Sequence, residues 1–144
     1  MRTVLQRVTS ARVTVSGEVV GQIGAGLVAL VGVTHGDGPQ EVSTTVRKIA
    51  DLRIMPQERS VTDVGAGVLV ISQFTLYADV RKGRRPSWNA AAPGEVAEPL
   101  VDAVAEGLRE RGVEVATGRF GARMAVDIHA DGPVTLVVDA PPLG

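Results

Sequence analysis

Two short polar segments, each next to an apolar run, hold the residues of this sequence that could do chemistry. Ser72-Gln73-Phe74-Thr75 follows the apolar run 67–71, and Asp131-Gly132-Pro133-Val134-Thr135 precedes the apolar run 136–138. Polar groups at the rim of a strand can line a pocket, because the core holds the rim still while the rim stays open to ligand. Such hydroxyl, amide and backbone N–H groups can orient an ester and stabilise an oxyanion. They include no strong general base, so the proton transfer would need help from the substrate.

Both segments also have a purely structural interpretation. A strand that leaves the core carries polar residues where it meets water, and the pattern alone favours this interpretation for residues 72–75. A Gly-Pro pair is very often a turn between two strands. Alternatively, the bond between Gly132 and Pro133 is cis, which would hold the Gly132 carbonyl in a direction that a trans turn does not allow.

A third segment, residues 81–85, concentrates positive charge in an otherwise balanced chain. Its basic residues are Arg81, Lys82, Arg84 and Arg85. The whole chain has 15 Lys and Arg against 16 Asp and Glu, a formal net charge of −1, so a nucleic-acid partner would have to be held locally. The segment is either a solvated loop or a surface for phosphates. Its local charge and the small Gly83 favour phosphates, with Trp88 available for stacking or for an interface.

Few other residues of this sequence have the types and spacing of known catalytic or metal-binding sites. The chain has no cysteine, which excludes disulfides, thiol nucleophiles and thiolate metal sites. A Ser-His-Asp triad could use Ser72 and His129, but the sequence lacks a Gly-x-Ser-x-Gly elbow. No His, Asp or Glu pair has ligand spacing on a shared element, and no GxGxxG or GxxxxGKS run is present. We therefore expect no metal and no cofactor.

The elements that must position these segments are mostly strands. The length of 144 residues suits one domain, and a core with 44% hydrophobic but only 3% aromatic residues consists mainly of Val, Leu, Ile and Ala. Alternation and apolar runs predict strands at 2–8, 11–15, 18–23, 27–33, 68–76, 113–117, 123–129 and 134–138. Apolar stripes predict helices at 39–54 and 93–111.

This order of elements predicts a mixed α/β domain over residues 1–144, in which two helices pack on a strongly curved, barrel-like sheet. Residues 55–67 are expected to form a loop, residues 79–92 to be irregular and residues 140–144 to be a loose tail. The N-terminus lacks the apolar region of a signal peptide, and no apolar run is long enough to span a bilayer. The expected location is the cytoplasm, with no membrane partner.

Several segments of this sequence, taken together and in their order along the chain, resemble the D-aminoacyl-tRNA deacylase family, also called D-tyrosyl-tRNA deacylases. The resemblance runs nearly end to end, through Leu5-Gln6-Arg7-Val8, Gly26-Leu27-Val28 and residues 48–54, 72–79, 81–87, 117–122 and 131–135. It implies a cytoplasmic homodimer that hydrolyses the ester between a D-amino acid and the 3′-terminal adenosine of tRNA, as proofreading in translation quality control. It also implies removal of glycine wrongly loaded on tRNA for alanine.

The resemblance further implies roles for single residues. It places Ser72, Gln73, Phe74 and Thr75 in the pocket wall. It makes Gly132 and Pro133, with Thr135 beside them, a cis-proline gate that reaches into the pocket of the other subunit, where carbonyl oxygens exclude an L side chain. The 2′-hydroxyl of the terminal adenosine would assist hydrolysis, whereas an older view makes Thr75 or Thr135 the nucleophile. Ala130 departs from the family pattern, which usually has Asn there.

Two alternatives stay open at this point. One is a non-catalytic RNA-binding module that uses the basic residues 81–85. The other is a relative with relaxed chirality, in which the bond before Pro133 is trans. Turnover of D-tyrosyl-tRNA and L-tyrosyl-tRNA distinguishes the enzyme from the module.

Overall fold

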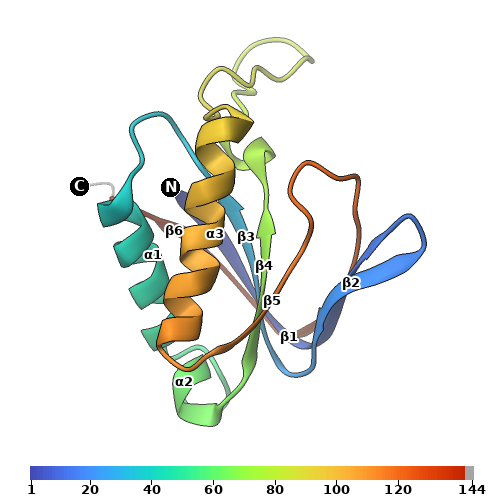
Figure 1. Cartoon of the computed structure of the whole chain (residues 1–144), viewed down its shortest axis with the longest axis vertical. Coiled ribbons are helices and arrows are strands. Elements are labelled where there is room, and N and C mark those ends of the chain that lie inside the picture. Colours follow the sequence, from blue (N-terminus) through green and yellow to red (C-terminus); the bar gives the residue numbers. More distant parts are fainter. Residues whose placement is uncertain (142–144) are drawn as a thin grey trace.

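Two long antiparallel strands, β1 and β6, organise the sheet. The computed structural model describes residues 1–141, and within them β1 (Arg2–Val15) pairs with β6 (Ala125–Asp139) along almost its whole length. On its other side, β1 pairs with β3 (Gly26–Gly32) through residues 2–8 and with β2 (Glu18–Ile23) through residues 11–15. One strand therefore joins both halves of a strongly curved sheet (Figure 1).

The sheet continues from β3 into two parallel strands. β4 (Gly67–Ser72) lies parallel to β3, and β5 (Glu114–Thr117) lies parallel to β4. β3 and β4 are buried on both faces, which explains their nearly continuous apolar sequences. β2 and β5, the two ends of this strand order, approach each other closely. A Cβ atom added to Gly21 of β2 would clash with the Thr117 carbonyl oxygen of β5. The sheet is thus nearly closed, and the prediction of a barrel-like α/β fold is confirmed.

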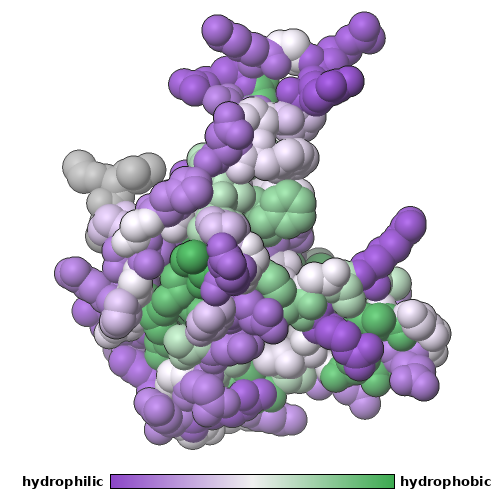
Figure 2. Space-filling model, turned by 45° about the horizontal axis from the view of Figure 1, so that its top comes forward, coloured by the Kyte–Doolittle hydropathy of each residue, from purple (hydrophilic) through white to green (hydrophobic). Residues whose placement is uncertain are grey.

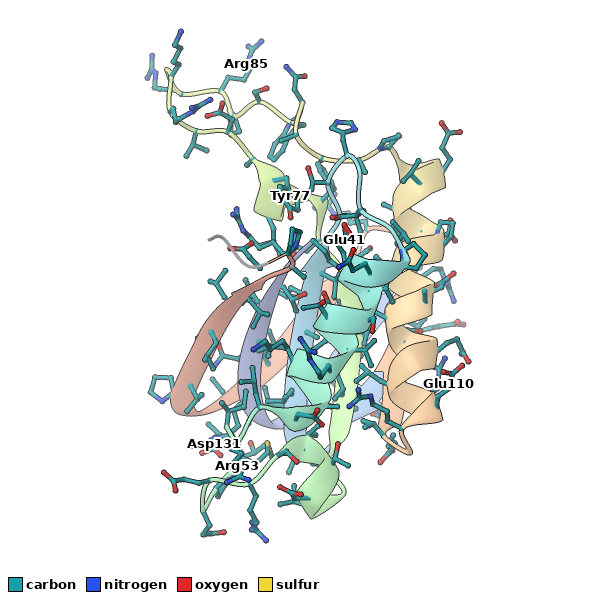
Figure 3. All side chains as sticks on the ribbon, turned by 90° about the vertical axis from the view of Figure 1, so that its left-hand side faces the viewer. Glu41, Arg53, Tyr77, Arg85, Glu110 and Asp131 are labelled. Atoms are coloured by element: carbon teal, nitrogen blue, oxygen red, sulfur yellow. The ribbon has the colours of Figure 1, made fainter. Side chains whose placement is uncertain are left out.

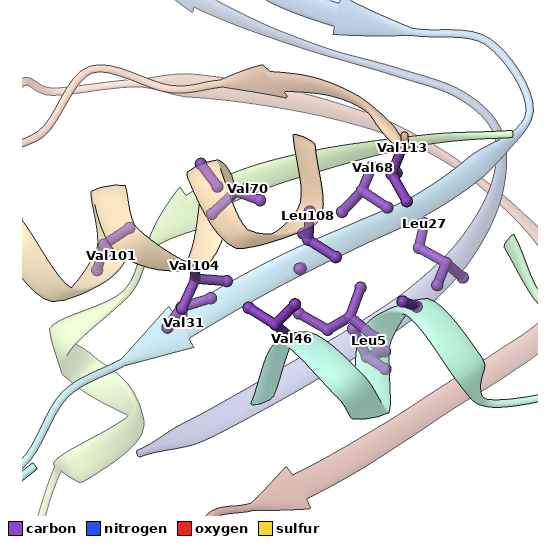
Figure 4. Close-up of a cluster of buried hydrophobic side chains, with 14 of the residues drawn as sticks. Leu5, Leu27, Val31, Val46, Val68, Val70, Val101, Val104, Leu108 and Val113 are labelled. Atoms are coloured by element: carbon purple, nitrogen blue, oxygen red, sulfur yellow. The ribbon is translucent and has the colours of Figure 1, made fainter. Parts of the chain in front are cut away.

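Two long helices cover one face of this sheet (Figure 1). α1 (Pro39–Asp51) starts at a proline, which suits the first turn of a helix, and α3 (Gly94–Glu110) packs beside it. Their buried residues recur at spacings of three and four, so each helix buries one stripe. These stripes and the facing side chains of the sheet form the larger hydrophobic cluster, shown in part in Figure 4: Leu5, Leu27, Val31, Val46, Val68, Val70, Val101, Val104, Leu108 and Val113.

A smaller hydrophobic cluster fills the opposite face of the sheet. Its buried members come from the C-terminal half of β1, from β2 and from the second face of β3 and β4: Val8, Ala11, Val13, Val15, Ile23, Val28, Leu69 and Ile71. Ala122 and Met124, from the loop between β5 and β6, pack against it. The two clusters hold β3 and β4 from both sides, so the rim that follows β4 has a rigid base.

The structure corrects several predicted element bounds. The strands predicted at 2–8 and 11–15 are one strand, because shifts of register after Gln6 and after Val8 interrupt the alternation without ending the strand. Those predicted at 123–129 and 134–138 are likewise joined in β6. The strand predicted to reach residue 76 ends at Ser72. A 3-10 turn, η1 (Phe74–Tyr77), begins two residues later.

The expectation of two helices was also incomplete. A third helix, α2 (Val61–Val64), lies in the stretch expected to be a loop. Four residues are too few to show a helical period, but the reciprocal hydrogen bonds of Ser60 and Asp63 form a capping box that starts the helix. No helix within residues 1–141 is long and apolar enough to cross a membrane. Of the predicted loose tail, residues 142–144 lie outside the described residues.

Candidate active site

The segment that follows β4 is held against β3 by its backbone. The Gln73 N–H donates to the Val31 carbonyl oxygen over 2.8 Å, one residue beyond the end of β4. A Cβ atom on Gly32 would lie 3.0 Å from the Gln73 carbonyl oxygen and 3.3 Å from the Tyr77 ring, so the glycine allows this close approach. The segment then turns through η1, and the side-chain amide of Gln73 donates to the Thr75 hydroxyl. Ser72, Gln73 and Thr75 are half-buried, whereas Phe74 is exposed.

A largely apolar cavity of about 350 Å³ opens beside this segment. β3, α3 and the loop before α3 form its floor and walls, and Ser72, Gln73 and Phe74 form one side. The rings of Phe74 and Trp88 meet edge to face, with centroids 5.3 Å apart. Phe120 and Gly121, from the loop after β5, border the cavity. Three of the four predicted pocket residues, 72–74, therefore line one side of this cavity, whereas Thr75 does not line it, and Trp88 is part of its wall.

The predicted phosphate-binding residues lie on a loop that projects from the same end of the molecule. This basic loop (residues 79–88) is closed at its base by two backbone hydrogen bonds between Asp79 and Ser87. Figure 2 shows hydrophilic side chains gathered on the projecting loop, and Arg85 lies near its tip in Figure 3. Its four basic side chains are all exposed: Arg81, Lys82, Arg84 and Arg85.

One carboxylate offsets part of this charge. Arg81 donates two side-chain hydrogen bonds to Asp79, over 2.9 and 2.8 Å, and this bonding lowers the pKa of Asp79 to about 2. Asp79 therefore stays charged near neutral pH and partly neutralises Arg81. Lys82, Arg84 and Arg85 have no ion-pair partner among residues 1–141, so they carry the uncompensated charge of the loop.

The second predicted segment bulges from the middle of β6. Gln6 of β1 is opposite Thr135 and Val8 is opposite Ala130, so four residues of β6, 131–134, face the single residue Arg7. The peptide bond between Gly132 and Pro133 is cis, and Gly132 has a φ of 119°. Gly132, Pro133 and Thr135 are exposed.

Two side chains of β1 hold this Gly-Pro segment (residues 131–135). The Arg7 Nε atom lies 3.2 Å from a carboxylate oxygen of Asp131, and its Nη1 donates to the Ile54 carbonyl oxygen over 3.1 Å. Gln6 donates to the Val134 carbonyl oxygen and accepts a 2.7 Å hydrogen bond from the Thr135 hydroxyl. Sequence reasoning assigned no role to Gln6 or Arg7, although both lie in the first segment of the family resemblance.

The structure does not bring the two predicted segments together within one chain. In Figure 3, Tyr77, at the end of η1, lies in the upper half of the molecule below the basic loop, whereas Asp131, beside Gly132, lies near the lower end. His129 also lies away from the cavity: it pairs with Ser10 on β1 and lines a separate shallow pocket. A triad of Ser72 and His129 is therefore not formed in the chain.

The described residues that line the cavity include no His, Asp, Glu or Lys side chain. Burial raises the pKa of Tyr77 to about 12, so this phenol stays protonated near neutral pH. Residues 1–141 contain no group of three His, Asp or Glu side chains that could hold a metal ion. The hydroxyl and amide groups of the polar rim can orient a substrate and stabilise an oxyanion.

Solved structures share this architecture. A structure described as "Structural Analysis of a probable eukaryotic D-amino acid tRNA deacylase" aligns with a TM-score of 0.83 at 19% identity, over 95% of this chain and 97% of that one. At such low identity the match shows the fold alone. A structure described as "c-Myc DNA Unwinding Element Binding Protein" aligns with a TM-score of 0.91 at 40% identity, over 99% of this chain and all of that one.

The sequence comparisons show the family. The family model described as D-Tyr-tRNA(Tyr) deacylase matches residues 4–139. A protein of Kineococcus radiotolerans named D-aminoacyl-tRNA deacylase is 65% identical over 141 residues, which cover 97% of this chain and all of the relative. A protein of the same name from Beutenbergia cavernae is 67% identical with the same coverage. The chain belongs to the D-Tyr-tRNA(Tyr) deacylase family, a family of hydrolases, and the resemblance seen in the sequence is confirmed.

Proposed function

We propose that this protein hydrolyses the ester between a D-amino acid and the 3′-terminal adenosine of tRNA. The observation that carries this proposal is the position of the cavity between the polar segment 72–75 and the basic loop. Its volume is in the range of small-ligand sites, and the rings of Phe74 and Trp88 offer faces and edges for a nucleobase. With the adenine inside, the aminoacyl ester lies at the polar rim and the preceding phosphates lie toward the basic loop.

The hydrolysis needs orientation more than acid–base chemistry from the protein. Water attacks the ester carbonyl carbon, the bond to the ribose oxygen breaks, and this oxygen takes up a proton, which gives a free D-amino acid and tRNA. Ser72, Gln73 and Thr75 orient the ester and stabilise its oxyanion. Because Tyr77 stays protonated, we assign the help with proton transfer to the 2′-hydroxyl of the terminal adenosine. Thr75 already accepts a hydrogen bond from Gln73, which suits an orienting role better than a nucleophilic one.

The chirality gate requires a second copy of the chain. Gly132, Pro133 and Thr135 are exposed, and Figure 3 shows the neighbouring Asp131 well separated from Tyr77 of η1, so we propose a homodimer in which each Gly-Pro segment reaches the partner's site. Among residues 1–141, β6 pairs only with β1, so its other edge is free of the described strands, and β6 exposes three apolar side chains, Val126, Ile128 and Val137. A free, partly apolar edge is typical of a surface that a partner covers. Main-chain oxygens of the gate would then exclude an L side chain, while glycine on tRNA for alanine would be accepted because it has no side chain.

Substrate turnover tests the proposed function. Purified protein is incubated with D-tyrosyl-tRNA and with L-tyrosyl-tRNA, and release of the amino acid is followed. We expect release from the D ester alone. Binding of tRNA without release would instead support the non-catalytic RNA-binding module. We also place this activity in the cytoplasm, where aminoacyl-tRNA is used.

The basic loop gives a first prediction about binding. Replacing Arg84 and Arg85 together by alanine removes two uncompensated positive charges. We expect the slope of log binding constant against log salt concentration to decrease in magnitude by about one to two. Each lost phosphate contact reduces this slope by about 0.7–0.9. The measurement is tRNA affinity over a series of salt concentrations.

A matched control removes the same charge elsewhere. Arg109 and Arg111 lie at the C-terminal end of α3, at the opposite end of the molecule from the basic loop, and both form ion pairs on the surface. Their double alanine variant should leave the salt dependence as in the wild type. An unchanged slope for the Arg84 and Arg85 variant would contradict the assignment of the basic loop to the tRNA-binding surface.

A further inference from the structure

The turn η1 carries Phe74 and Thr75 but buries little of itself. None of its four residues is buried, and 56% of the Phe74 surface is exposed. Its backbone hydrogen bonds are mostly internal: the Leu76 N–H donates to Gln73 and the Ala78 N–H donates to Thr75. Leu76 and Tyr77 pack against β3 at Gly32, and polar contacts to the sheet add to the placement of the turn.

One side chain of the sheet supplies such contacts. Arg2, at the start of β1, donates from Nη1 to the Leu76 carbonyl oxygen over 3.3 Å. Its Cζ atom lies 5.3 Å from the centroid of the Tyr77 ring, a cation–π distance. Within residues 1–141, this is the one side-chain hydrogen bond to the backbone of η1 from the sheet. A single guanidinium thus contacts the last two residues of the turn.

The guanidinium is itself fixed by β6. Arg2 donates from Nε to Asp139 over 2.8 Å, and the two residues are opposite each other in the register of β1 and β6. A planar guanidinium can bind a carboxylate and a carbonyl in fixed directions at once, which a lysine ammonium does less well. The sheet therefore orients Arg2, and Arg2 orients the turn.

We propose that Arg2 is a positioning residue for the reaction, which holds η1 so that Phe74 and Thr75 stay at the rim of the cavity. This inference rests on the proposed function, because it assigns Arg2 a role in that reaction. Arg2 does not line the cavity, so it acts through η1 and not on the substrate. Asp139 shares the role by orienting Arg2.

The kinetic test compares two similar ion pairs on the same strands. Arg12 and Asp127 also join β1 to β6, with 3.1 Å between Nε and the carboxylate oxygen, but Arg12 makes no hydrogen bond to η1. We expect Arg2→Ala to lower kcat on D-tyrosyl-tRNA about tenfold, because small displacements of orienting groups cost about that much or more. KM should rise as well, because η1 carries Phe74 and Phe74 forms one side of the cavity. Arg2→Lys should recover part of kcat, and Arg12→Ala should match the wild type.

A second measurement reports on η1 without any substrate. Tyr77 is the one tyrosine of the chain, so its phenolate absorbance can be titrated alone. Burial, Asp37 and Asp139 raise the pKa of Tyr77 to about 12, and the positive charge of Arg2 opposes them. If η1 stays in place without Arg2, this pKa rises further. If η1 moves away from the sheet, the phenol becomes hydrated and its pKa falls toward about 10.

The two measurements distinguish a failure of the proposed function from a failure of the role assigned to Arg2. At pH 11, a phenol with a pKa of about 12 is about one-tenth ionised, and one with a pKa of about 10 is about nine-tenths ionised. We expect strong phenolate absorbance at this pH for Arg2→Ala and weak absorbance for the wild type and Arg12→Ala. If the wild type released no D-tyrosine, the proposed function would fail while the titration still tested the contact. An active wild type with an Arg2→Ala variant that matches Arg12→Ala in kcat would overturn the inference.

Discussion

Gly132→Ala is expected to lower the ratio of D-tyrosyl-tRNA to L-tyrosyl-tRNA hydrolysis by about thirtyfold. Gly132 has a φ of 119°, a conformation that L residues rarely adopt. A Cβ atom there would lie 2.9 Å from the Val134 nitrogen and 3.1 Å from Nη2 of Arg7. Strain of about 1–3 kcal/mol favours other conformations of the segment by about fivefold to 150-fold. In the proposed dimer, displaced carbonyl oxygens would no longer exclude the L side chain, so the ratio should fall mainly because the L ester is hydrolysed.

The control for this variant is a glycine with a similar backbone but open surroundings. Gly17, in the turn between β1 and β2, has a φ of 82° and nothing within 4 Å of its Cβ position. Gly17→Ala introduces similar local strain far from the gate and should leave the ratio unchanged. The measurement is initial hydrolysis rate on each ester. Retention of full discrimination by Gly132→Ala would contradict the assignment of the gate to the Gly-Pro segment.

Phe74→Ala is expected to raise KM for D-tyrosyl-tRNA about thirtyfold with little change in kcat. Stacking of a nucleobase on an aromatic side chain contributes about 1–3 kcal/mol, which corresponds to about fivefold to 150-fold in affinity. Phe74 forms one side of the cavity and meets Trp88, so its removal opens the proposed adenine site. Because more than half of its surface is exposed, the free energy of unfolding should change little.

Val80 provides the matched control. It follows η1 in sequence and exposes 68% of its surface, but it does not line the cavity. Val80→Ala removes an exposed apolar side chain nearby and should leave KM as in the wild type. Steady-state kinetics over a range of D-tyrosyl-tRNA concentrations separate KM from kcat. If Phe74→Ala lowered kcat alone, Phe74 would act on the ester and not on the nucleobase.

The parts of the fold that depend on repetition were predictable from the sequence. The apolar runs of β3 and β4 indicated core strands, and the stripes of α1 and α3 indicated two helices against the sheet. Short or irregular features were not predictable in this way. α2 has only four residues, and η1 interrupts a sequence that still looks like a strand. Local hydrogen bonds determine both α2 and η1, and such bonds produce no periodic pattern of apolar residues in the sequence.

The candidate site was predicted in part. The sequence indicated the rim of β4 and the basic loop, because polar and charged residues there interrupt the surrounding pattern. The far side of the cavity was missed: Ala97 and Val101 of α3 follow the same spacing as core residues, so only tertiary packing shows that they border a cavity. Phe120 lies in the family-like segment 117–122, which could have indicated its place. The roles of Gln6 and Arg7 depend on the bulge in β6, which pairing across the sheet defines.

The separation of η1 from the Gly-Pro segment along the long axis has a genetic consequence in the proposed dimer. Each catalytic centre would combine the cavity of one polypeptide with the gate of the other. In a hybrid of one Phe74→Ala subunit and one Gly132→Ala subunit, both defects would fall on the same centre. The remaining centre would have an intact cavity and an intact gate, so two alleles that are each defective would complement one another when expressed together.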